Sequence, residues 1–235
     1  MSGARQAVGF LTVLGPAAVP GPEALAWFPL TGAAIGLAVG GAWWGAAQVW
    51  PWPVAAAVAV VVDLALTGML HFDGLCDAAD GLLPVLPADR RLEVMRSPGL
   101  GAFGVGAAVA LLLLRWAALG AHAPVPLLVA ALWGASRAVM ALVVARVPYA
   151  RAEGLARAFM GSKALVPAVG LALCVALAAA WRPVVGPIAV LSVAAGGAAV
   201  VGLAWRRVGG FTGDVLGAAG MVGETVGLLG LVASW

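Results

Sequence analysis

The sequence carries little charge for its length. Charged residues make up 10% of its 235 positions, whereas hydrophobic residues make up 63%. A soluble domain has about a quarter of its residues charged. With a mean hydropathy of +1.06, the chain is predicted to be a membrane protein with several spanning helices.

Cysteine and histidine are scarce as well. The two cysteines, Cys76 and Cys174, lie far apart, and the chain has only two histidines. Neither residue type shows metal-ligand spacing, so no disulfide framework and no zinc site is expected. The net charge is +3, and nearly all of the positive charge comes from arginine. In a membrane protein this informs topology first, so we expect membrane lipid around the chain and no nucleic-acid partner.

Long apolar runs dominate what the sequence does contain. A helix that crosses a bilayer needs about 20 apolar residues. Seven runs, separated by proline, glycine or charge, are predicted to span the membrane: 28–49, 54–71, 101–120, 125–146, 165–181, 184–204 and 214–233. Residues 6–15 are predicted to form a short interfacial helix. No internal repeat is visible, so residues 1–235 are expected to form a single all-α integral membrane domain.

The arginines predict an orientation. With seven spans, nearly all positive charges fall on the side that holds the N-terminus and the loops 72–100, 147–163 and 205–213. The opposite loops clearly hold only Arg182. Positive charge favours the cytoplasmic side. We therefore expect a multi-pass protein of the inner, cytoplasmic membrane, with the N-terminus in the cytoplasm and the C-terminus outside.

Three aspartates gather in the stretch LHFDGLCDAADGLL at 70–83. On a helix, Asp73, Asp77 and Asp80 share one stripe. Carboxylates so placed repel one another and are costly to keep ionised near a bilayer. A divalent cation relieves both problems, and Mg²⁺ is usually held by a few carboxylates together with substrate phosphates. The stripe therefore predicts a Mg²⁺ or Mn²⁺ site. The alternative is a solvated acidic helix end, but such ends seldom place all their carboxylates on a single stripe.

Ionisable residues also occur inside the predicted spans, where such groups are functional hypotheses by default. Asp63 could equally be a protonated residue bonded to a neighbouring helix. Arg137 requires an anionic partner, either an aspartate of the stripe or a substrate phosphate. The loop at 147–163 adds polar groups on the same side. Metal and arginines together suit a phosphoanhydride substrate.

Four segments together resemble one enzyme family. They are FPLTGAAIG at 28–36, HFDGLCDAADG at 71–81, PYARAEGLARAFMG at 148–161 and GGFTGDVLGA at 209–218. Over nearly the whole chain, this pattern resembles cobalamin synthase, the adenosylcobinamide-GDP ribazoletransferase of the last stage of coenzyme B12 assembly. The resemblance implies a Mg²⁺-dependent transferase that joins α-ribazole, or its 5′-phosphate, to adenosylcobinamide-GDP and releases GMP.

The resemblance also implies roles for individual residues. The implied metal ligands are Asp73, Asp77, Asp80 and Asp214. Asp80 is the first choice for the base that takes the proton of the ribazole 5′-hydroxyl, and His71 is the second. The implied substrate contacts are Arg137, Tyr149, Arg151, Lys163 and Glu224. A homo-oligomer and an association with other late enzymes of B12 assembly both stay open.

The sequence departs from the family pattern in three places. The first is at the N-terminus, where F-L-T at 10–12 is not followed by the Arg-Leu-Pro that the family often has. MRSPGLG at 95–101 stands where the family commonly has M-x-D-S-R-x-G, so that an Asp and an Arg are replaced by Ser97 and Gly99. Met221 stands where the family often has Glu. A substrate contact of the 95–101 loop is therefore expected to be lost or moved, and the family's residue roles carry over less well near these positions.

Other function classes compete with this interpretation. A CDP-alcohol phosphotransferase that makes phospholipid would use a longer aspartate pattern with an Ala-Arg pair that is absent here. A proton-coupled transporter would use Asp63, Arg137 and Glu224 as a relay, but transporters usually show internal repeats. A purely structural membrane subunit would tolerate alanine at Asp73 or Asp77.

Overall fold

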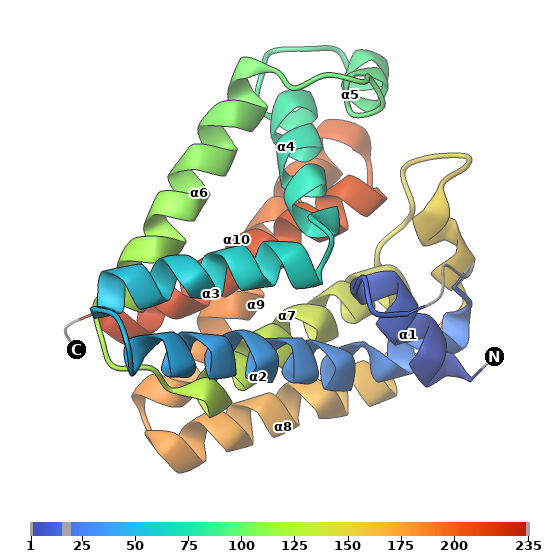
Figure 1. Cartoon of the computed structure of the whole chain (residues 1–235). Coiled ribbons are helices and arrows are strands. Elements are labelled where there is room, and N and C mark those ends of the chain that lie inside the picture. Colours follow the sequence, from blue (N-terminus) through green and yellow to red (C-terminus); the bar gives the residue numbers. More distant parts are fainter. Residues whose placement is uncertain (1, 16–19, 234–235) are drawn as a thin grey trace.

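The computed structural model describes residues 2–15 and 20–233. Over these residues the chain is helical and contains no strand, which confirms the predicted all-α bundle (Figure 1). The elements are α1 (Gly3–Leu11), η1 (Pro22–Trp27), α2 (Phe28–Ala47), α3 (Trp52–Leu66), α4 (Leu70–Leu82), α5 (Ala88–Val94), α6 (Ala102–Gly120), α7 (Pro126–Arg146), η2 (Leu155–Phe159), α8 (Leu165–Trp181), α9 (Val185–Val208) and α10 (Gly213–Val232), where η marks a 3-10 segment.

Most predicted spans correspond to one long apolar helix each. Five segments of the described chain are long and apolar enough to cross a membrane: Pro22–Ala47, Ala102–Gly120, Pro126–Arg146, Val185–Val208 and Gly213–Val232. Helix α8 is apolar but has only 17 residues. A short helix near the N-terminus is also present, but it spans Gly3–Leu11 (α1) rather than 6–15, and its interfacial location stays a prediction. The molecule is thus a multi-pass helical membrane protein.

The second predicted span is wrong as a single helix over 54–71. Helix α3 ends at Leu66, and α4 leaves it at an angle of 90°. Gly68 and Met69 both adopt left-handed backbone angles, with φ of +58° and +57°. The Thr67 hydroxyl donates to the Asp63 carbonyl at 2.7 Å. This turn directs the aspartate-bearing helix across the end of the bundle, so α3 and α4 form at most one broken span.

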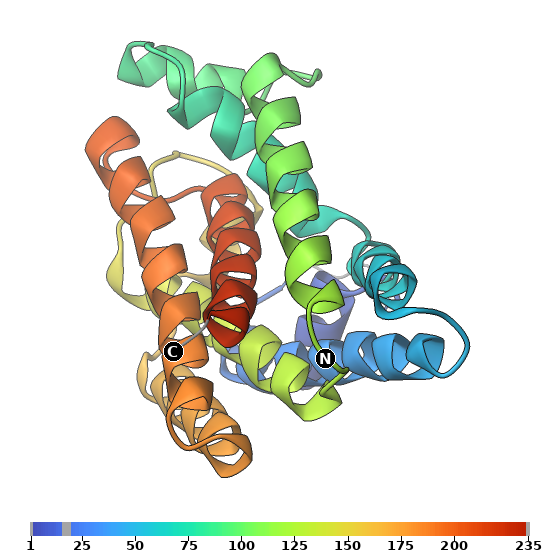
Figure 2. The same cartoon turned by 90° about the vertical axis from the view of Figure 1, so that its left-hand side faces the viewer.

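The connections gather at two ends of the bundle. Helix α1, the α3–α4 turn and the long loop containing η2 lie together around one cavity, here called the loop end (Figure 1). Residues of the α6–α7, α8–α9 and C-terminal segments meet at the opposite end, including His122, Arg182 and Leu231. The rotated view in Figure 2 shows α6, α10 and α9 side by side between these ends. The predicted grouping of the loops is confirmed, whereas the cytoplasmic orientation stays a prediction.

Small residues allow the spanning helices to approach closely. Gly32, Gly36 and Gly40 form a row along α2 that faces α7. A Cβ atom at Gly36 would lie 2.5 Å from the carbonyl oxygen of Val129. A Cβ at Gly223 on α10 would lie 2.7 Å from the carbonyl oxygen of Val193 on α9. Without a hydrophobic driving force between helices in lipid, such close packing is a main source of helix association.

We expect Gly36→Ala to destabilise the bundle by about 1–3 kcal/mol, because the added methyl group overpacks the α2–α7 contact. Gly41→Ala is the matched control on the same helix, since no atom lies within 4 Å of its added Cβ. The control should be neutral or slightly stabilising, because alanine favours a helix more than glycine. Thermal unfolding in detergent, followed by circular dichroism, measures both. Equal effects would contradict the proposed packing.

Candidate active site

Two glycines bring the aspartate-bearing helix against α10. A Cβ at Gly74 on α4 would lie 3.0 Å from the carbonyl oxygen of Asp214. A Cβ at Gly217 on α10 would lie 3.1 Å from the Cα of His71. The contact places Asp73 and Asp214, which are far apart in sequence, on the same cavity. The glycines of both motifs therefore serve the approach of the two helices.

A short backbone pairing joins the loop after α7 to the turn before α10. The N–H of Ala150 donates to the Phe211 carbonyl at 2.8 Å, and the N–H of Phe211 donates to the Pro148 carbonyl at 3.0 Å. A side chain at Gly210 would collide with Pro148, because its Cβ would lie 2.2 Å from that carbonyl oxygen. Thr212 then caps α10 by accepting the N–H of Val215 at 3.2 Å.

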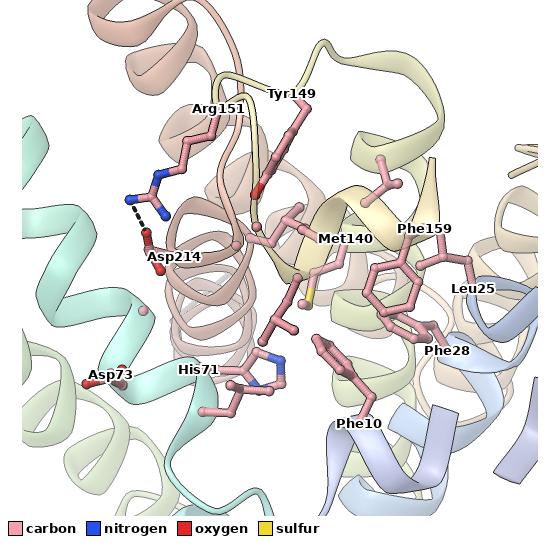
Figure 3. A pocket seen from close by; sticks show the side chains of 18 residues that line it. Phe10, Leu25, Phe28, His71, Asp73, Met140, Tyr149, Arg151, Phe159 and Asp214 are labelled. Atoms are coloured by element: carbon pink, nitrogen blue, oxygen red, sulfur yellow. Dashed lines mark ion pairs between the residues drawn. The ribbon is translucent and has the colours of Figure 1, made fainter. Parts of the chain in front are cut away.

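This pairing sets Arg151 beside Asp214. The guanidinium Nη2 lies 2.8 Å from the Asp214 carboxylate, and Asp214 also accepts the Thr212 hydroxyl at 3.2 Å. Figure 3 shows the ion pair on the upper wall of the cavity, with Tyr149 next to it. The motifs at 148–161 and 209–218 thus meet through their backbones, and this contact positions a cation beside a carboxylate.

The cavity at the loop end has a volume of about 270 Å³. Its polar wall carries an imidazole, a phenol, a guanidinium and two carboxylates, from His71, Tyr149, Arg151, Asp73 and Asp214 (Figure 3). The opposite wall is apolar. A cavity with few converging polar groups on an otherwise apolar lining is typical of a small-molecule site.

Three phenylalanines form the apolar wall and are called the phenylalanine cluster below. Phe10, Phe28 and Phe159 come from α1, α2 and η2. Their ring centroids lie 5.0, 5.4 and 6.0 Å apart in pairs, within the range of favourable aromatic contacts. The cluster joins the N-terminal helix to the η2 loop and offers flat apolar faces to the cavity.

Tyr149 supplies a neutral hydroxyl. Burial raises the pKa of the Tyr149 phenol, and the neighbouring Arg151 guanidinium offsets part of this effect. The phenol is therefore protonated at neutral pH and can donate a hydrogen bond. Gly154, with a φ of +149°, makes room for it, since a Cβ there would lie 2.1 Å from the phenol oxygen.

Asp80 has a different environment from Asp73. Its two carboxylate oxygens accept the backbone N–H groups of Gly101 and Gly104 at 2.7 and 2.8 Å, at the start of α6. It is buried and does not line the cavity, whereas Asp73 is exposed and does. The last residue of the altered loop at 95–101 therefore donates its backbone N–H to Asp80. The roles predicted for Asp80, base and metal ligand, stay predictions.

The described residues contain no group of three or more His, Cys, Asp and Glu side chains that could hold a metal alone. Mg²⁺ does not need such a cage, because it is commonly bound by one or two carboxylates plus substrate phosphates. Asp77 lies within electrostatic reach of Asp73, Asp214 and Arg151. The oxygen chemistry of these three carboxylates fits the predicted ion.

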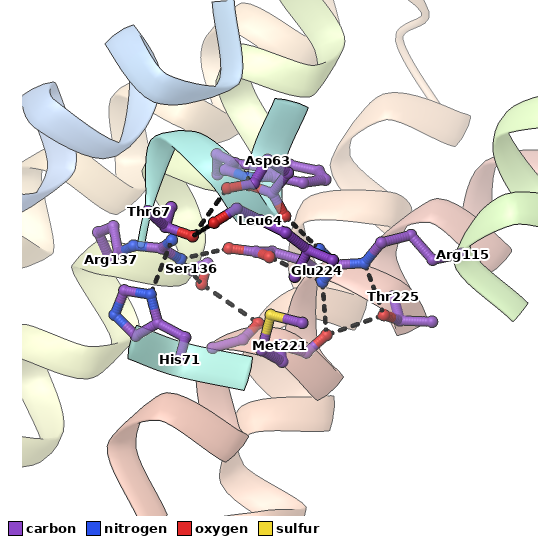
Figure 4. A network of polar contacts seen from close by, with 12 residues as sticks. Asp63, Leu64, Thr67, His71, Arg115, Ser136, Arg137, Met221, Glu224 and Thr225 are labelled. Atoms are coloured by element: carbon purple, nitrogen blue, oxygen red, sulfur yellow. Dashed lines mark hydrogen bonds and ion pairs between the residues drawn. The ribbon is translucent and has the colours of Figure 1, made fainter. Parts of the chain in front are cut away.

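A buried charge network lies behind the cavity and consists of Asp63, Arg115, Arg137 and Glu224 (Figure 4). Arg115 donates to Asp63 at 2.6 Å and to Glu224 at 2.8 Å. Glu224 also pairs with Arg137. Each residue comes from a different helix, in order α3, α6, α7 and α10. All four side chains are at most 4% exposed, and their formal charges cancel.

Neutral partners add further hydrogen bonds to this network. The Trp133 indole donates to Asp63 at 2.8 Å. Arg115 also reaches the Met221 carbonyl at 3.0 Å and the Thr225 hydroxyl at 3.3 Å. The backbone of Met221, where the family often has Glu, thus serves the network. Buried charges are tolerated when they are paired and hydrogen-bonded in this way.

The network corrects several sequence expectations. Arg137 takes Glu224 as its anionic partner, rather than an aspartate of the stripe. Neither residue lines the cavity, and Lys163 is exposed away from it. The structure therefore brings only Tyr149 and Arg151 of the predicted substrate contacts to the cavity. Arg115 was not among the predicted site residues, yet it is buried and pairs with both Asp63 and Glu224. Its position inside an apolar run was the available signal.

Comparisons with known proteins identify the family. A family model described as cobalamin-5-phosphate synthase matches residues 3–232. The chain belongs to this family. Proteins named adenosylcobinamide-GDP ribazoletransferase are similar over most of their length. One from Chlorobium phaeovibrioides is 33% identical, covering 95% of this chain and 94% of its own, and one from Shigella boydii is 37% identical, covering 87% and 85%.

A third such protein, from Chlorobaculum parvum, is 35% identical and covers 93% of this chain and 90% of its own. No solved structure matches. The cobalamin synthase motifs quoted from the sequence thus lie in a matched region that runs through all of the spanning helices, and they meet at the loop-end cavity.

We expect Arg115→Met to destabilise the protein by about 3–5 kcal/mol, because it leaves buried carboxylates without their shared cation. Arg90→Met is the control, since Arg90 and Glu93 form an exposed pair whose removal costs little. Unfolding in detergent, followed by tryptophan fluorescence, measures both variants. Similar midpoints for the two would show that the network contributes nothing to stability.

Proposed function

We propose that the chain is an enzyme that joins α-ribazole, or its 5′-phosphate, to adenosylcobinamide-GDP and releases GMP. The product is adenosylcobalamin, or its 5′-phosphate, at the last stage of coenzyme B12 synthesis. Family membership over residues 3–232, with the family motifs converging on one cavity, carries this proposal. The reaction fits the polar wall, which offers cationic and neutral donors to phosphate oxygens.

The reaction is a transfer at phosphorus. A ribose hydroxyl oxygen attacks the phosphorus attached to cobinamide, the bond from that phosphorus to GMP breaks, and the hydroxyl proton passes to a carboxylate. The 5′ oxygen already carries phosphate in α-ribazole 5′-phosphate. Because one hydroxyl should serve both substrates, we replace the 5′-hydroxyl expected from the sequence by another hydroxyl of the ribose.

The residues of the polar wall would stabilise the negative charge of the phosphates. Arg151 and the Tyr149 phenol donate to phosphate oxygens as negative charge moves onto the departing GMP. Asp73, Asp77 and Asp214 would hold Mg²⁺, with Asp80 the fourth predicted ligand and the first-choice base. When bound, Mg²⁺ neutralises the pyrophosphate oxygens and the leaving group.

The phenylalanine cluster suggests where the base of ribazole lies. Its planar aromatic base would rest against Phe10, Phe28 and Phe159, while its ribose faces the polar wall. A cavity of about 270 Å³ accommodates a ligand part of this size rather than the whole corrinoid. The corrinoid would then remain at the cavity mouth, on the side that we propose faces the cytoplasm.

Two alternatives are less well supported. A phospholipid-forming CDP-alcohol phosphotransferase would accept a nucleotide-lipid substrate, and the relatives carry a different name. A proton-coupled transporter would use Asp63, Arg137 and Glu224 as a relay. These residues are instead tied to one another and to Arg115 in a neutral, fully buried network.

The first test measures base-on cobalamin absorbance and GMP release by protein purified in detergent. We expect both products from adenosylcobinamide-GDP, α-ribazole and Mg²⁺. EDTA or Asp73→Ala should reduce the rate at least about 100-fold, because a stabiliser of transition-state charge is lost. Asp89→Ala, an exposed acid on α5, should keep the wild-type rate. Product formation unaffected by EDTA would contradict the Mg²⁺ role, and no product from folded wild-type protein would contradict the function.

The second test concerns the phenylalanine cluster. Phe159→Leu keeps an apolar side chain but removes a stacking surface, so we expect KM for α-ribazole to rise about tenfold, in line with the usual strength of base stacking. The KM for adenosylcobinamide-GDP should stay nearly constant. Met160→Ala is a control from the end of the same 3-10 segment, because its side chain is exposed and does not line the cavity. A rise in the KM for adenosylcobinamide-GDP alone would reverse the proposed placement.

A further inference from the structure

His71 occupies a special place between the cavity and the buried charge network. It lies in the first turn of α4, directly after the 90° break. Its side chain lines the cavity, yet the residue is only 3% exposed. Figure 3 shows the imidazole among the residues that line the cavity, and Figure 4 shows it beside Arg137 of the network.

The contact with Arg137 assigns the ring proton. His71 Nδ1 lies 3.4 Å from Nη2 of Arg137. A guanidinium has donors only and does not lose its proton in proteins, so Nδ1 must be the acceptor. A neutral imidazole that accepts at Nδ1 carries its proton at Nε2. A protonated, positively charged imidazole would also be repelled by the adjacent Arg137 guanidinium, which favours the neutral form.

The rest of the network holds Arg137 in this orientation. Its Nη1 donates to the Ser136 hydroxyl at 2.9 Å and pairs with Glu224. Glu224 is in turn held by Arg115. Because Arg137 cannot rotate without breaking a buried ion pair, the position of the donor behind Nδ1 is fixed.

Nε2, in contrast, is left without a partner. The atom is buried and makes no hydrogen bond to any part of the described chain. An unsatisfied buried donor is costly unless a ligand or water completes it. The cavity that His71 lines already presents Arg151 and Tyr149 to the same space. A phosphoryl oxygen held by these two donors is the natural acceptor for a third.

We propose that His71 is a neutral hydrogen-bond donor to a substrate phosphoryl oxygen through Nε2–H, and that Arg137 fixes this tautomer. His71 is thereby a catalytic residue that stabilises charge, rather than the second-choice general base that the resemblance implied, and Arg137 is a positioning residue. The inference rests on the proposed function for the identity of the acceptor, but the tautomer follows from the protein alone.

The tautomer is tested without turnover. The chain has two histidines, so ¹⁵N-histidine labelling gives two imidazoles, and His122→Gln assigns the signals. We expect a protonated Nε2 and an unprotonated Nδ1 for His71 in the detergent-solubilised wild-type protein at neutral pH. A ring protonated at Nδ1, or at both nitrogens, would overturn the proposal whatever the protein catalyses.

The role is tested by two substitutions. Gln keeps an N–H donor at about the reach of Nε2 but cannot act as a base, whereas Phe keeps the ring shape without a donor. We expect His71→Phe to lower kcat by about 100-fold, as removal of one transition-state donor does, and His71→Gln to recover at least tenfold of this loss. Equal loss in both variants would contradict the donor role. If folded wild type makes no product, the proposed function fails, and the tautomer measurement still decides the first claim.

Discussion

The rest of the structure depends on the pairing of four charges in an apolar interior. An ionised group inside a membrane protein is expensive unless a partner of opposite charge reaches it. Two arginines and two acids satisfy one another here, and each comes from a different helix. The pairs hold together only when α3, α6, α7 and α10 are all in place. The network therefore specifies the relative positions of these helices as well as their association.

The same network connects the membrane interior to the site. Asp63 belongs to the last full turn before the break in α3, and its carbonyl receives the hydroxyl of Thr67. His71 follows in the first turn of α4, against Arg137. Because of the break, Asp63 on α3 points inward to Arg115, whereas α4 carries the aspartate stripe across the end of the bundle. A straight helix over these residues would leave the stripe in line with the span, away from the η2 loop.

The sequence predicted what depends on local composition, and it missed what depends on pairing across distance. Apolar runs predicted the spanning helices because burial in lipid leaves a direct trace in composition. The break at 67–69 was missed because glycine is frequent inside membrane helices and Gly68 does not by itself mark the end of a span; the left-handed backbone angles of Gly68 and Met69 make the turn. The pairing of Arg115 with Glu224 joins helices 109 positions apart. No single-sequence signal identifies such a partner, and the same holds for the phenylalanine cluster.

The aspartate stripe shows the limit of reasoning from helical spacing. Spacing places Asp73, Asp77 and Asp80 on one stripe, but the neighbouring elements give them different environments. Backbone N–H groups at the start of α6 donate to both carboxylate oxygens of Asp80, whereas Asp73 remains exposed on the cavity. A shared stripe does not imply a shared ligand. With so few free carboxylates, the proposed Mg²⁺ would need further ligands, and the oxygens of the proposed pyrophosphate substrate would supply them. Metal and substrate would then assemble together, with Arg151 and His71 contacting the phosphate rather than the ion.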